Sequence, residues 1–201
     1  MLNGIIISGC SGVGKSTVIR RLLELHPEYT FSISCTTRKP RKGETGGVHY
    51  HFIDHAEFER RIEDGYFLEW EKVYTDYYGT PKTIIDEAER SPRVVIFELD
   101  TRGALVLKQK YPQFTAVSLL PPSIEDLAKR LSMRGSEDEK SLAERQLYTK
   151  EELHRLQKSD YAIINHSIDD TVEALETIIL SLNHRTRFAE GHIEGLLKAL
   201  K

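Results

Sequence analysis

Residues 4–16 read Gly-Ile-Ile-Ile-Ser-Gly-Cys-Ser-Gly-Val-Gly-Lys-Ser, and this stretch decides the fold. Its first half is a short β-branched run that stops at a glycine, which is typical of a buried parallel strand entering a turn. Its second half leads into the segment from Lys15 to Leu25, where apolar residues recur at helical spacing until His26-Pro27 ends the pattern. We therefore expect a strand, a glycine-rich loop and a helix in direct succession.

The loop between this strand and helix fits the pattern G-x-x-x-x-G-K-[ST] at every fixed position. Its glycines let backbone N–H groups surround phosphates at a helix N-terminus, Lys15 can neutralise β- and γ-phosphate oxygens, and the Ser16 hydroxyl can bind Mg²⁺. The alternatives are a turn that only caps the helix, or a site that binds a nucleotide without turning it over. We predict a nucleoside triphosphate site made of Gly9, Cys10, Ser11, Gly12, Val13, Gly14, Lys15, Ser16 and Thr17. Because the loop acts through its backbone, Cys10 is expected to be a small filler with no redox role.

Further apolar runs alternate with helical stretches along the rest of the chain, which predicts an α/β core with a mostly parallel sheet. These runs are Phe31 to Ile33, Val94 to Leu99, Ala116 to Leu120 and Tyr161 to Ile164. Between about Arg38 and Pro81 the pattern changes to turn-rich and alternating sequence, which indicates an inserted subdomain. We expect Thr80 and Pro81 to cap and open a helix that runs to about Arg90.

Composition excludes several classes of protein. The 201 residues are 39% hydrophobic and 29% charged, so a globular core is expected rather than disorder. The formal net charge of −3 gives no overall attraction for nucleic acid or an anionic membrane. The only two cysteines, Cys10 and Cys35, show neither a disulfide framework nor zinc-ligand spacing, and the N-terminus has no signal-peptide pattern. We expect a cytoplasmic protein with no nucleic-acid or membrane partner.

A second anion site is predicted after the loop. Arg38 and Arg41 lie three residues apart ahead of Tyr50, and guanidinium groups bind phosphate through two parallel hydrogen bonds. A tyrosine hydroxyl adds a neutral donor, so a phosphomonoester is a suitable ligand. The alternative is that these are solvated turn arginines.

The chain resembles the guanylate kinase family, which phosphorylates GMP with ATP, from about Ile5 to Asn165. Besides the phosphate loop, the stretch from Thr36 to Phe52 is similar to the family signature, and residues 65–70 and 77–80 are similar to its guanine-binding segment. The resemblance implies that the GMP phosphate is held by Arg38, Arg41, Tyr50 and Tyr78. It also implies that the base is contacted by Glu69, Thr80 and Ser34.

The chemistry of guanine agrees with this assignment. Guanine presents two adjacent donors, N1–H and N2–H₂, beside the O6 acceptor, and one carboxylate with one hydroxyl matches that edge. Adenine lacks the donor pair and would leave a buried carboxylate unpaired, at a cost of about 1–3 kcal/mol or more. From the residues alone, Glu69 is also compatible with a surface carboxylate.

Two acids, Glu98 and Asp100, end the predicted strand from Val94 to Leu99, at the sheet edge where α/β proteins hold ligands. The family usually has Asp at the position of Glu98 and Val-Gln at Thr101-Arg102. We place both acids in the GMP site and favour Asp100, with Ser16, for Mg²⁺. Simple solvation of both acids at a strand end is the alternative.

Three arginines of the second helical region resemble the family's lid: Arg130, Arg134 and Arg145. Phosphoryl transfer needs positive charge around the moving group more than acid–base help, and we assign these arginines, with Lys15, to catalysis. Arginines on an ordinary charged helix face are the alternative. By the resemblance, Asn165 contacts the adenine of ATP.

These observations predict a single P-loop nucleoside monophosphate kinase domain, with ATP and GMP as partners and Mg²⁺ as cofactor. The expected core is 1–34, 82–125 and 158–184, with an NMP-binding subdomain at 35–81, a helical lid at 126–157 and a C-terminal extension at 185–201. Two rivals are a catalytically silent guanylate-kinase-like interaction domain and a kinase for another acceptor, such as a phosphorylated sugar. The first tends to lose the phosphate loop, and Glu69 and Thr80 disfavour the second.

The C-terminal extension carries its own pattern. Ile193, Leu196, Leu197 and Leu200 fall at i, i+3, i+4 and i+7, which predicts an amphipathic helix beyond the region of resemblance. We expect its apolar stripe to pack against the chain's own core, with self-association into a homo-oligomer as the alternative.

Overall fold

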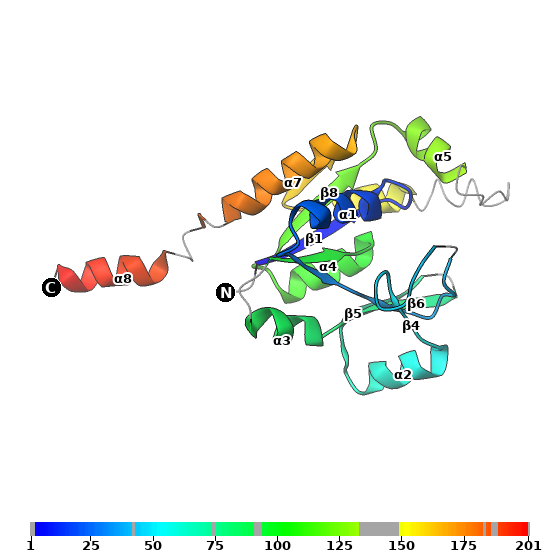
Figure 1. The fold of residues 1–201 in the computed structure, drawn as a ribbon, viewed down its shortest axis with the longest axis horizontal. Coiled ribbons are helices and arrows are strands. Elements are labelled where there is room, and N and C mark those ends of the chain that lie inside the picture. Colours follow the sequence, from blue (N-terminus) through cyan, green and yellow to red (C-terminus); the bar gives the residue numbers. More distant parts are fainter. Residues whose placement is uncertain are drawn as a thin grey trace.

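The chain forms two sheets with helices packed against them (Figure 1). The computed structural model describes residues 3–41, 43–73, 75–90, 94–132, 149–182, 184–185 and 189–200. The larger sheet and the helices on it comprise β1 (Asn3–Gly9), α1 (Lys15–Leu25), β2 (Thr30–Ser32), β7 (Val94–Glu98), α4 (Thr101–Lys110), β8 (Thr115–Leu120), β9 (Tyr161–Ile164) and α7 (Ile168–Leu182). The second sheet and its helices comprise β3 (Cys35–Thr36), β4 (His51–Phe52), α2 (His55–Glu63), β5 (Phe67–Val73), β6 (Asp76–Pro81) and α3 (Thr83–Arg90). The remaining helices are α5 (Ile124–Ser132), residues 149–156 and α8 (Glu190–Ala199).

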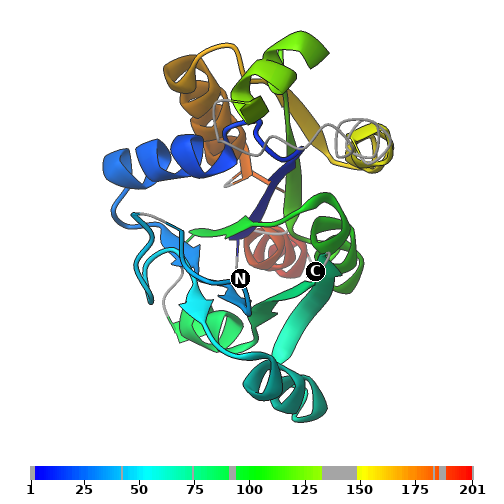
Figure 2. The same ribbon diagram turned by 90° about the vertical axis from the view of Figure 1, so that its right-hand side faces the viewer.

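The larger sheet is fully parallel, in the order β2-β7-β1-β8-β9. Strand β1 is central and both its faces are buried, because Ile5 and Ile7 point to one face and Ile6 to the other. Helices α1 and α7 cover the first face and α4 covers the second (Figure 2). The predicted α/β class with a parallel sheet is confirmed.

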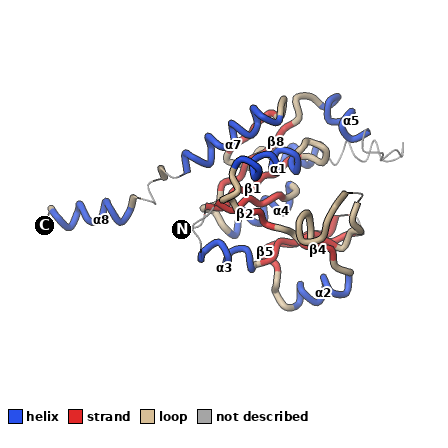
Figure 3. Tube along the Cα trace, viewed as in Figure 1, coloured by secondary structure: helices blue, strands red, loops and turns tan. Residues whose placement is uncertain are grey.

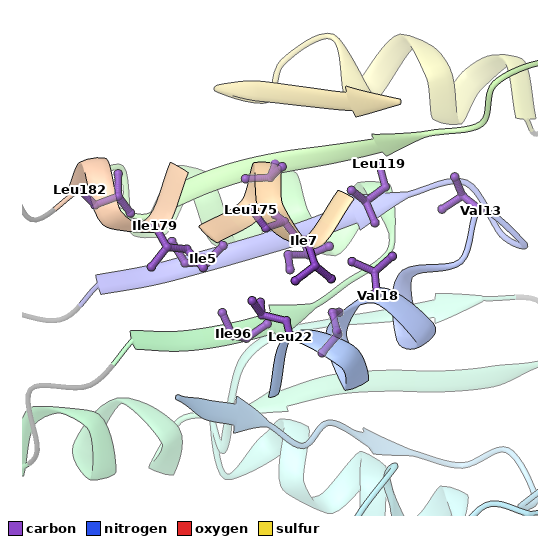
Figure 4. Close-up of a cluster of buried hydrophobic side chains, with 13 residues drawn as sticks. Ile5, Ile7, Val13, Val18, Leu22, Ile96, Leu119, Leu175, Ile179 and Leu182 are labelled. Carbon is purple, nitrogen blue, oxygen red and sulfur yellow. The ribbon is translucent and has the colours of Figure 1, made fainter. Parts of the chain in front are cut away.

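The main core lies between the sheet and the pair α1 and α7. Figure 4 shows the side chains of β1, β7 and β8 pointing toward those of the two helices. Leu22 of α1 and Leu175 of α7 are fully buried there beside Ile5 and Ile7. Burial of each such aliphatic side chain contributes about 1.5–3 kcal/mol, so this layer fixes β1 and with it the start of the loop.

The second sheet is mixed, in the order β4-β3-β6-β5, and all four strands lie within residues 35–81. Its β5 and β6 pair antiparallel in a register that sets Glu69 beside Thr80. The cap predicted at Thr80-Pro81 is wrong, because both residues belong to β6 and the next helix begins at Thr83. The Thr80 hydroxyl donates to the Glu69 side chain and is not available to cap a helix.

The carboxyl ends of β1 and β7 meet at one edge of the parallel sheet, since Ile7 is in register with Glu98. This is the edge at which open α/β sheets bind ligands. In the view of Figure 3, the second sheet, where β4 and β5 are labelled, lies below the parallel sheet. Within the described residues, no helix combines the length and the apolar character needed to cross a bilayer.

Helix α8 stands apart from the rest of the chain and buries none of its residues (Figures 1 and 3). The predicted amphipathic helix is therefore present. The expectation that its apolar stripe packs against the chain's own core is wrong, because Ile193, Leu196, Leu197 and Leu200 are all exposed.

Candidate active site

The loop from Cys10 to Gly14 joins β1 to α1 and has the conformation that its glycines permit. Gly12 and Gly14 adopt positive φ angles of 85° and 105°. An added Cβ on Gly14 would lie 2.8 Å from Nδ2 of Asn165, so a larger residue fits neither the backbone nor the space there. Lys15 folds back over the loop, and its ammonium group donates to the carbonyls of Gly9 at 2.6 Å and Cys10 at 3.3 Å. The positive charge therefore lies where loop N–H groups can surround phosphates.

The loop is held from behind by residues distant in sequence. The Val13 carbonyl accepts hydrogen bonds from Asn165 Nδ2 at 2.8 Å and from Arg130 at 3.0 Å. Asn165 is buried, and its Oδ1 accepts from the Thr171 hydroxyl at 2.9 Å. In this structure Asn165 and Arg130 brace the loop, and the adenine contact assigned to Asn165 stays a prediction.

Cys10 is fully buried against Leu127 and Leu156. Burial, and next the negative charge of the nearby Glu152, together raise the pKa of its thiol to about 12. A thiol in this state is not a nucleophile at neutral pH. This agrees with a filling role for Cys10.

Glu98 connects the loop to the second half of the site. Its carboxylate accepts a hydrogen bond of 2.7 Å from the Ser16 hydroxyl at the start of α1. Burial, and next the negative charge of Glu98, raises the pKa of Tyr50. Glu98 therefore lies between the phosphate loop and the predicted acceptor clamp.

Asp100 has a different position from Glu98. Its Oδ1 accepts from the backbone N–H groups of Arg102 at 2.9 Å and Gly103 at 2.7 Å, which makes it the N-cap of α4. Its charge raises the pKa values of both Glu69 and Glu71, after the larger effect of burial. The contact with Ser16 is made by Glu98, so the geometry favours Glu98 over Asp100 on the metal side.

The acceptor clamp is organised around Arg38. Its guanidinium group forms two hydrogen bonds with the Glu44 carboxylate, at 2.7 and 2.9 Å, and lies over the Tyr50 ring. Tyr78 is in edge contact with Tyr50, with ring centroids 6.1 Å apart. The structure thus brings Arg38, Tyr50 and Tyr78 together.

Glu44 is a site residue that the sequence analysis missed. Its carboxylate also accepts from the backbone N–H of Arg41 at 2.7 Å, so one acid orders both ends of the arginine segment. The hydrogen bonds from Arg38 lower the pKa of Glu44 to about 2. The sequence does contain a signal for this contact, because an acid three residues after Arg41 can accept a hydrogen bond from the Arg41 backbone across a turn.

The pair Glu69 and Thr80 forms a second, buried part of the site. Thr80 donates to Glu69 Oε1 at 2.6 Å, and the two residues are 0% and 5% exposed, respectively. Burial raises the pKa of Glu69 to about 7, while the Thr80 hydrogen bond opposes that shift. An added Cβ on Gly103 would lie 2.8 Å from Glu69 Oε2, so this glycine leaves the space that the carboxylate occupies.

Two other residues predicted for the GMP site are Ser34 and Arg41. Ser34 is nearly buried, and its carbonyl accepts from the His51 backbone at 2.9 Å. Arg41 is exposed. Arg134 and Arg145 lie outside the described residues.

Glu152, on the helical residues 149–156, was also missed by the sequence analysis. It is 4% exposed and accepts hydrogen bonds from the Ser11 backbone and the Cys10 thiol. Burial raises its pKa, and the charge of Lys15 opposes the shift. A carboxylate in the predicted lid thus contacts the phosphate loop, and no local pattern in the sequence indicates this contact.

Comparison with known proteins places the arrangement in a family. The guanylate kinase family model matches residues 1–182. The guanylate kinase of Clostridium perfringens is 43% identical over 192 residues, which cover 95% of this chain and 89% of that protein. That of Helicobacter pylori is 40% identical over 199 residues, which cover 99% and 96%. The crystal structure of guanylate kinase from Anaplasma phagocytophilum superposes with a TM-score of 0.73 at 26% identity, covering 89% of this chain and 85% of that one. The chain belongs to the guanylate kinase family.

Proposed function

We propose that this protein transfers the γ-phosphoryl group of ATP to GMP and releases ADP and GDP. The observation that carries the proposal is the position of Glu98, which hydrogen-bonds Ser16 of the phosphate loop and lies near Tyr50 of the acceptor clamp. A donor phosphate on the loop and an acceptor phosphate on the clamp would meet at this point. Direct in-line transfer then needs positioning and positive charge, with no covalent intermediate.

Positive charge for this step is available from the chain itself. Lys15 would leave the carbonyls of Gly9 and Cys10 for the β- and γ-phosphates, because an ammonium ion pairs more strongly with an anionic oxygen than with a carbonyl. We assign Arg130, Arg134 and Arg145 to the developing charge on the transferred group. Closure of the lid and subdomain would exclude water and so limit ATP hydrolysis.

The site offers suitable ligands for Mg²⁺. Ser16 Oγ, in the first turn of α1, and Glu98 Oε1, at the end of β7, lie 2.7 Å apart, and oxygen ligands are those that Mg²⁺ prefers. We propose Ser16 and Glu98 as the protein groups on the metal side, in place of Asp100. When bound, Mg²⁺ supplies charge neutralisation between the β- and γ-phosphates.

Guanine recognition follows from donor counting. In the structure the single Thr80 hydroxyl hydrogen is used on Glu69. We propose that bound guanine donates N1–H and N2–H₂ to Glu69, which releases the Thr80 hydroxyl to donate to O6. Every polar atom of this buried pair then keeps a partner.

The proposal is tested by a coupled ADP-release assay with ATP, Mg²⁺ and a panel of acceptors: GMP, IMP, AMP, UMP and a phosphorylated sugar. We expect turnover with GMP and a much lower rate with IMP, which lacks the 2-amino group. Excess EDTA should abolish turnover. The absence of ADP release with every acceptor, in a folded and ATP-binding protein, would support the silent interaction domain instead.

Activity should depend on pH through Glu69. Its pKa of about 7 means that the carboxylate is ionised above neutral pH and protonated below it, and only the ionised form accepts both guanine donors. We expect kcat/KM for GMP to rise by about 10-fold between pH 6 and pH 8. The GMP phosphate also takes up a proton near pH 6, so the matched control is Glu69→Gln, in which the part of the rise due to Glu69 should be lost.

Glu44→Gln should weaken the acceptor clamp. The side chains of Arg38 and Glu44 are only 14% and 17% exposed. Little water can therefore reach the Arg38 guanidinium to replace its interaction with the Glu44 carboxylate. We expect the KM for GMP to rise by about 10-fold with the KM for ATP unchanged. Glu57→Gln is the matched control, because Glu57 pairs with Arg60 and Arg61 on α2. An unchanged KM for GMP in Glu44→Gln would remove Glu44 from the clamp.

Gly103→Ala should displace Glu69 without unfolding the protein. The new methyl group would meet Glu69 Oε2 at 2.8 Å, so the carboxylate must shift. We expect kcat/KM for GMP to fall by about 10-fold, since misplacement at this scale impairs positioning. Gly191→Ala is the control, because an added Cβ there has nothing within 4 Å. Equal kinetics for the two variants would contradict the assigned role of Gly103.

A further inference from the structure

Strand β5 carries a second carboxylate beside Glu69. Glu71 lies two positions further along, and Trp70 between them is exposed, so both acids point to the inner face of the strand. In the register of β5 with β6, Glu69 is opposite Thr80 and Glu71 is opposite Tyr78. Side chains that face each other across an antiparallel pair are neighbours. Glu71 is therefore next to both the Glu69–Thr80 pair and Tyr78 of the acceptor clamp.

The hydrogen-bond partner of Glu71 is Arg102, in the first turn of α4. Arg102 Nη1 donates to Glu71 Oε1 at 2.9 Å, whereas Glu71 Oε2 is buried and receives no hydrogen bond from the described part of the chain. The Glu71 side chain is only 14% exposed, so little water can take the place of the arginine. Arg102 is 45% exposed and has a second carboxylate, that of Glu151, 3.9 Å from its Nη2. Glu71 therefore depends on Arg102 more than Arg102 depends on Glu71.

The charges in this region show why Glu71 needs a counter-ion. Burial, and next the negative charge of Asp100, raises the pKa of Glu71, and the hydrogen bond from Arg102 opposes this shift. Burial mainly raises the pKa of Glu69, and the charges of Asp100 and Glu71 add to this effect. Gly103, the residue after Arg102, leaves the space that Glu69 Oε2 occupies. One turn of α4 thus controls the surroundings of both carboxylates on β5.

We propose that Arg102 is a positioning residue for the GMP site, which acts by neutralising Glu71 beside Glu69. Without this partner, an ionised Glu71 would be an uncompensated charge next to the carboxylate that binds guanine, and neighbouring like charges disfavour each other's ionised form. Glu69 would then lose either its charge or its position beside Thr80. The inference rests on the proposed function, because it assigns Arg102 to the acceptor side of that same site.

Removal of Arg102 alone should weaken GMP binding. We expect Arg102→Gln to raise the Kd for GMP, measured by isothermal titration calorimetry, by about 10-fold or more, because a poorly hydrated carboxylate loses its partner. The KM for ATP should stay within about 2-fold of the wild-type value, since the phosphate loop keeps its own contacts. Arg102→Lys retains the positive charge and a donor, so it should hold the Kd for GMP within about 3-fold of the wild type.

The matched control is Arg155→Gln. Arg155 lies on the other side of the same turn of α4, and its hydrogen bonds in the described chain go to Glu151 at 2.7 Å and to the Thr101 hydroxyl at 3.5 Å. This variant removes one positive charge but leaves the pair of Arg102 and Glu71 in place. Its Kd for GMP should therefore equal that of the wild type.

A double variant separates neutralisation of Glu71 from a purely structural contact. Glu71 is costly only as an unpaired charge, so Arg102→Gln combined with Glu71→Gln should recover most of the GMP affinity that Arg102→Gln loses. Glu71→Gln alone should cost less than Arg102→Gln alone. If Arg102 only held α4 against β5, the double variant would bind GMP as poorly as Arg102→Gln.

Three results would each overturn the proposal: unchanged GMP affinity in a folded Arg102→Gln, an equal loss in Arg155→Gln, or weak GMP binding by a folded double variant. The last of these keeps the test decisive even where Arg102→Gln alone fails to fold. A wild type that binds no GMP would overturn the proposed function, and this inference with it. The two kinds of failure are distinguishable, because the first three results leave GMP binding by the wild type intact.

Discussion

Lys15→Ala is expected to lower kcat by about 10²- to 10³-fold or more, the range observed when a preorganised charge or donor is removed from a reacting centre. The ammonium group lies over the loop, with its hydrogen bonds directed to the carbonyls of Gly9 and Cys10. No other described lysine or arginine donates to those two carbonyls, so no neighbouring cation replaces it there.

The fold should tolerate this substitution. Lys15 lies at the first turn of α1 and belongs to none of the buried apolar clusters of the described chain. Loss of its hydrogen bonds costs about 1 kcal/mol, which corresponds to a fall of about 2–4 °C in melting temperature for a chain of this size. Lys158→Ala, at an exposed lysine, is the control for removal of one positive charge. A folded Lys15→Ala protein with near-normal turnover would contradict the assigned role.

Glu69→Gln is expected to reduce kcat/KM for GMP by about 30- to 1000-fold, equivalent to about 2–4 kcal/mol. Glutamine offers one acceptor oxygen and one NH₂ donor, so one guanine donor loses its acceptor and faces another donor. Because Glu69 is 5% exposed, water cannot relieve the mismatch. ATP binding at the loop should be nearly unaffected.

Stability separates this effect from misfolding. Burial disfavours the charged form of Glu69 in the folded protein, as its raised pKa shows, and a neutral amide does not carry that cost. The melting temperature of Glu69→Gln at pH 8 should therefore equal or exceed that of the wild type. Glu63→Gln, at an exposed position on α2, is the control. Wild-type kcat/KM for GMP in Glu69→Gln would remove Glu69, and with it guanine, from this pocket.

The parallel core could be predicted because its signals are local. The run Ile5 to Ile7, the glycines and Lys15 specify a strand, a loop and a helix within a short segment, and all three lie where they were expected. The error at Thr80 and Pro81 arose because their sequence suits a helix start, whereas pairing with β5 places them in a strand. Tertiary contact overrode the local preference.

The candidate site was predictable to the extent that its residues belong to contiguous motifs. Arg38, Tyr50, Glu69 and Thr80 were named from such motifs, and their roles remain predictions that the variants above test. Glu152 and Gly103 were not named, because each matters through a neighbour far along the chain: the phosphate loop for Glu152 and Glu69 for Gly103. The choice between Glu98 and Asp100 likewise required the contact with Ser16, 82 positions away from Glu98.

The hydrogen bond from Asn165 to Val13 has a consequence for synthesis on the ribosome. The two residues are 152 positions apart. At a translation rate of roughly 5–20 residues per second, Asn165 is therefore synthesised about 8–30 s after Val13. Strand β8 is translated before Asn165, whereas α7 and its leucines come after it. The nascent chain therefore carries its phosphate loop from the start but can fix the shape of that loop only near the end of translation. A ribosome-bound chain stalled before Asn165 should accordingly bind ATP far more weakly than the released protein.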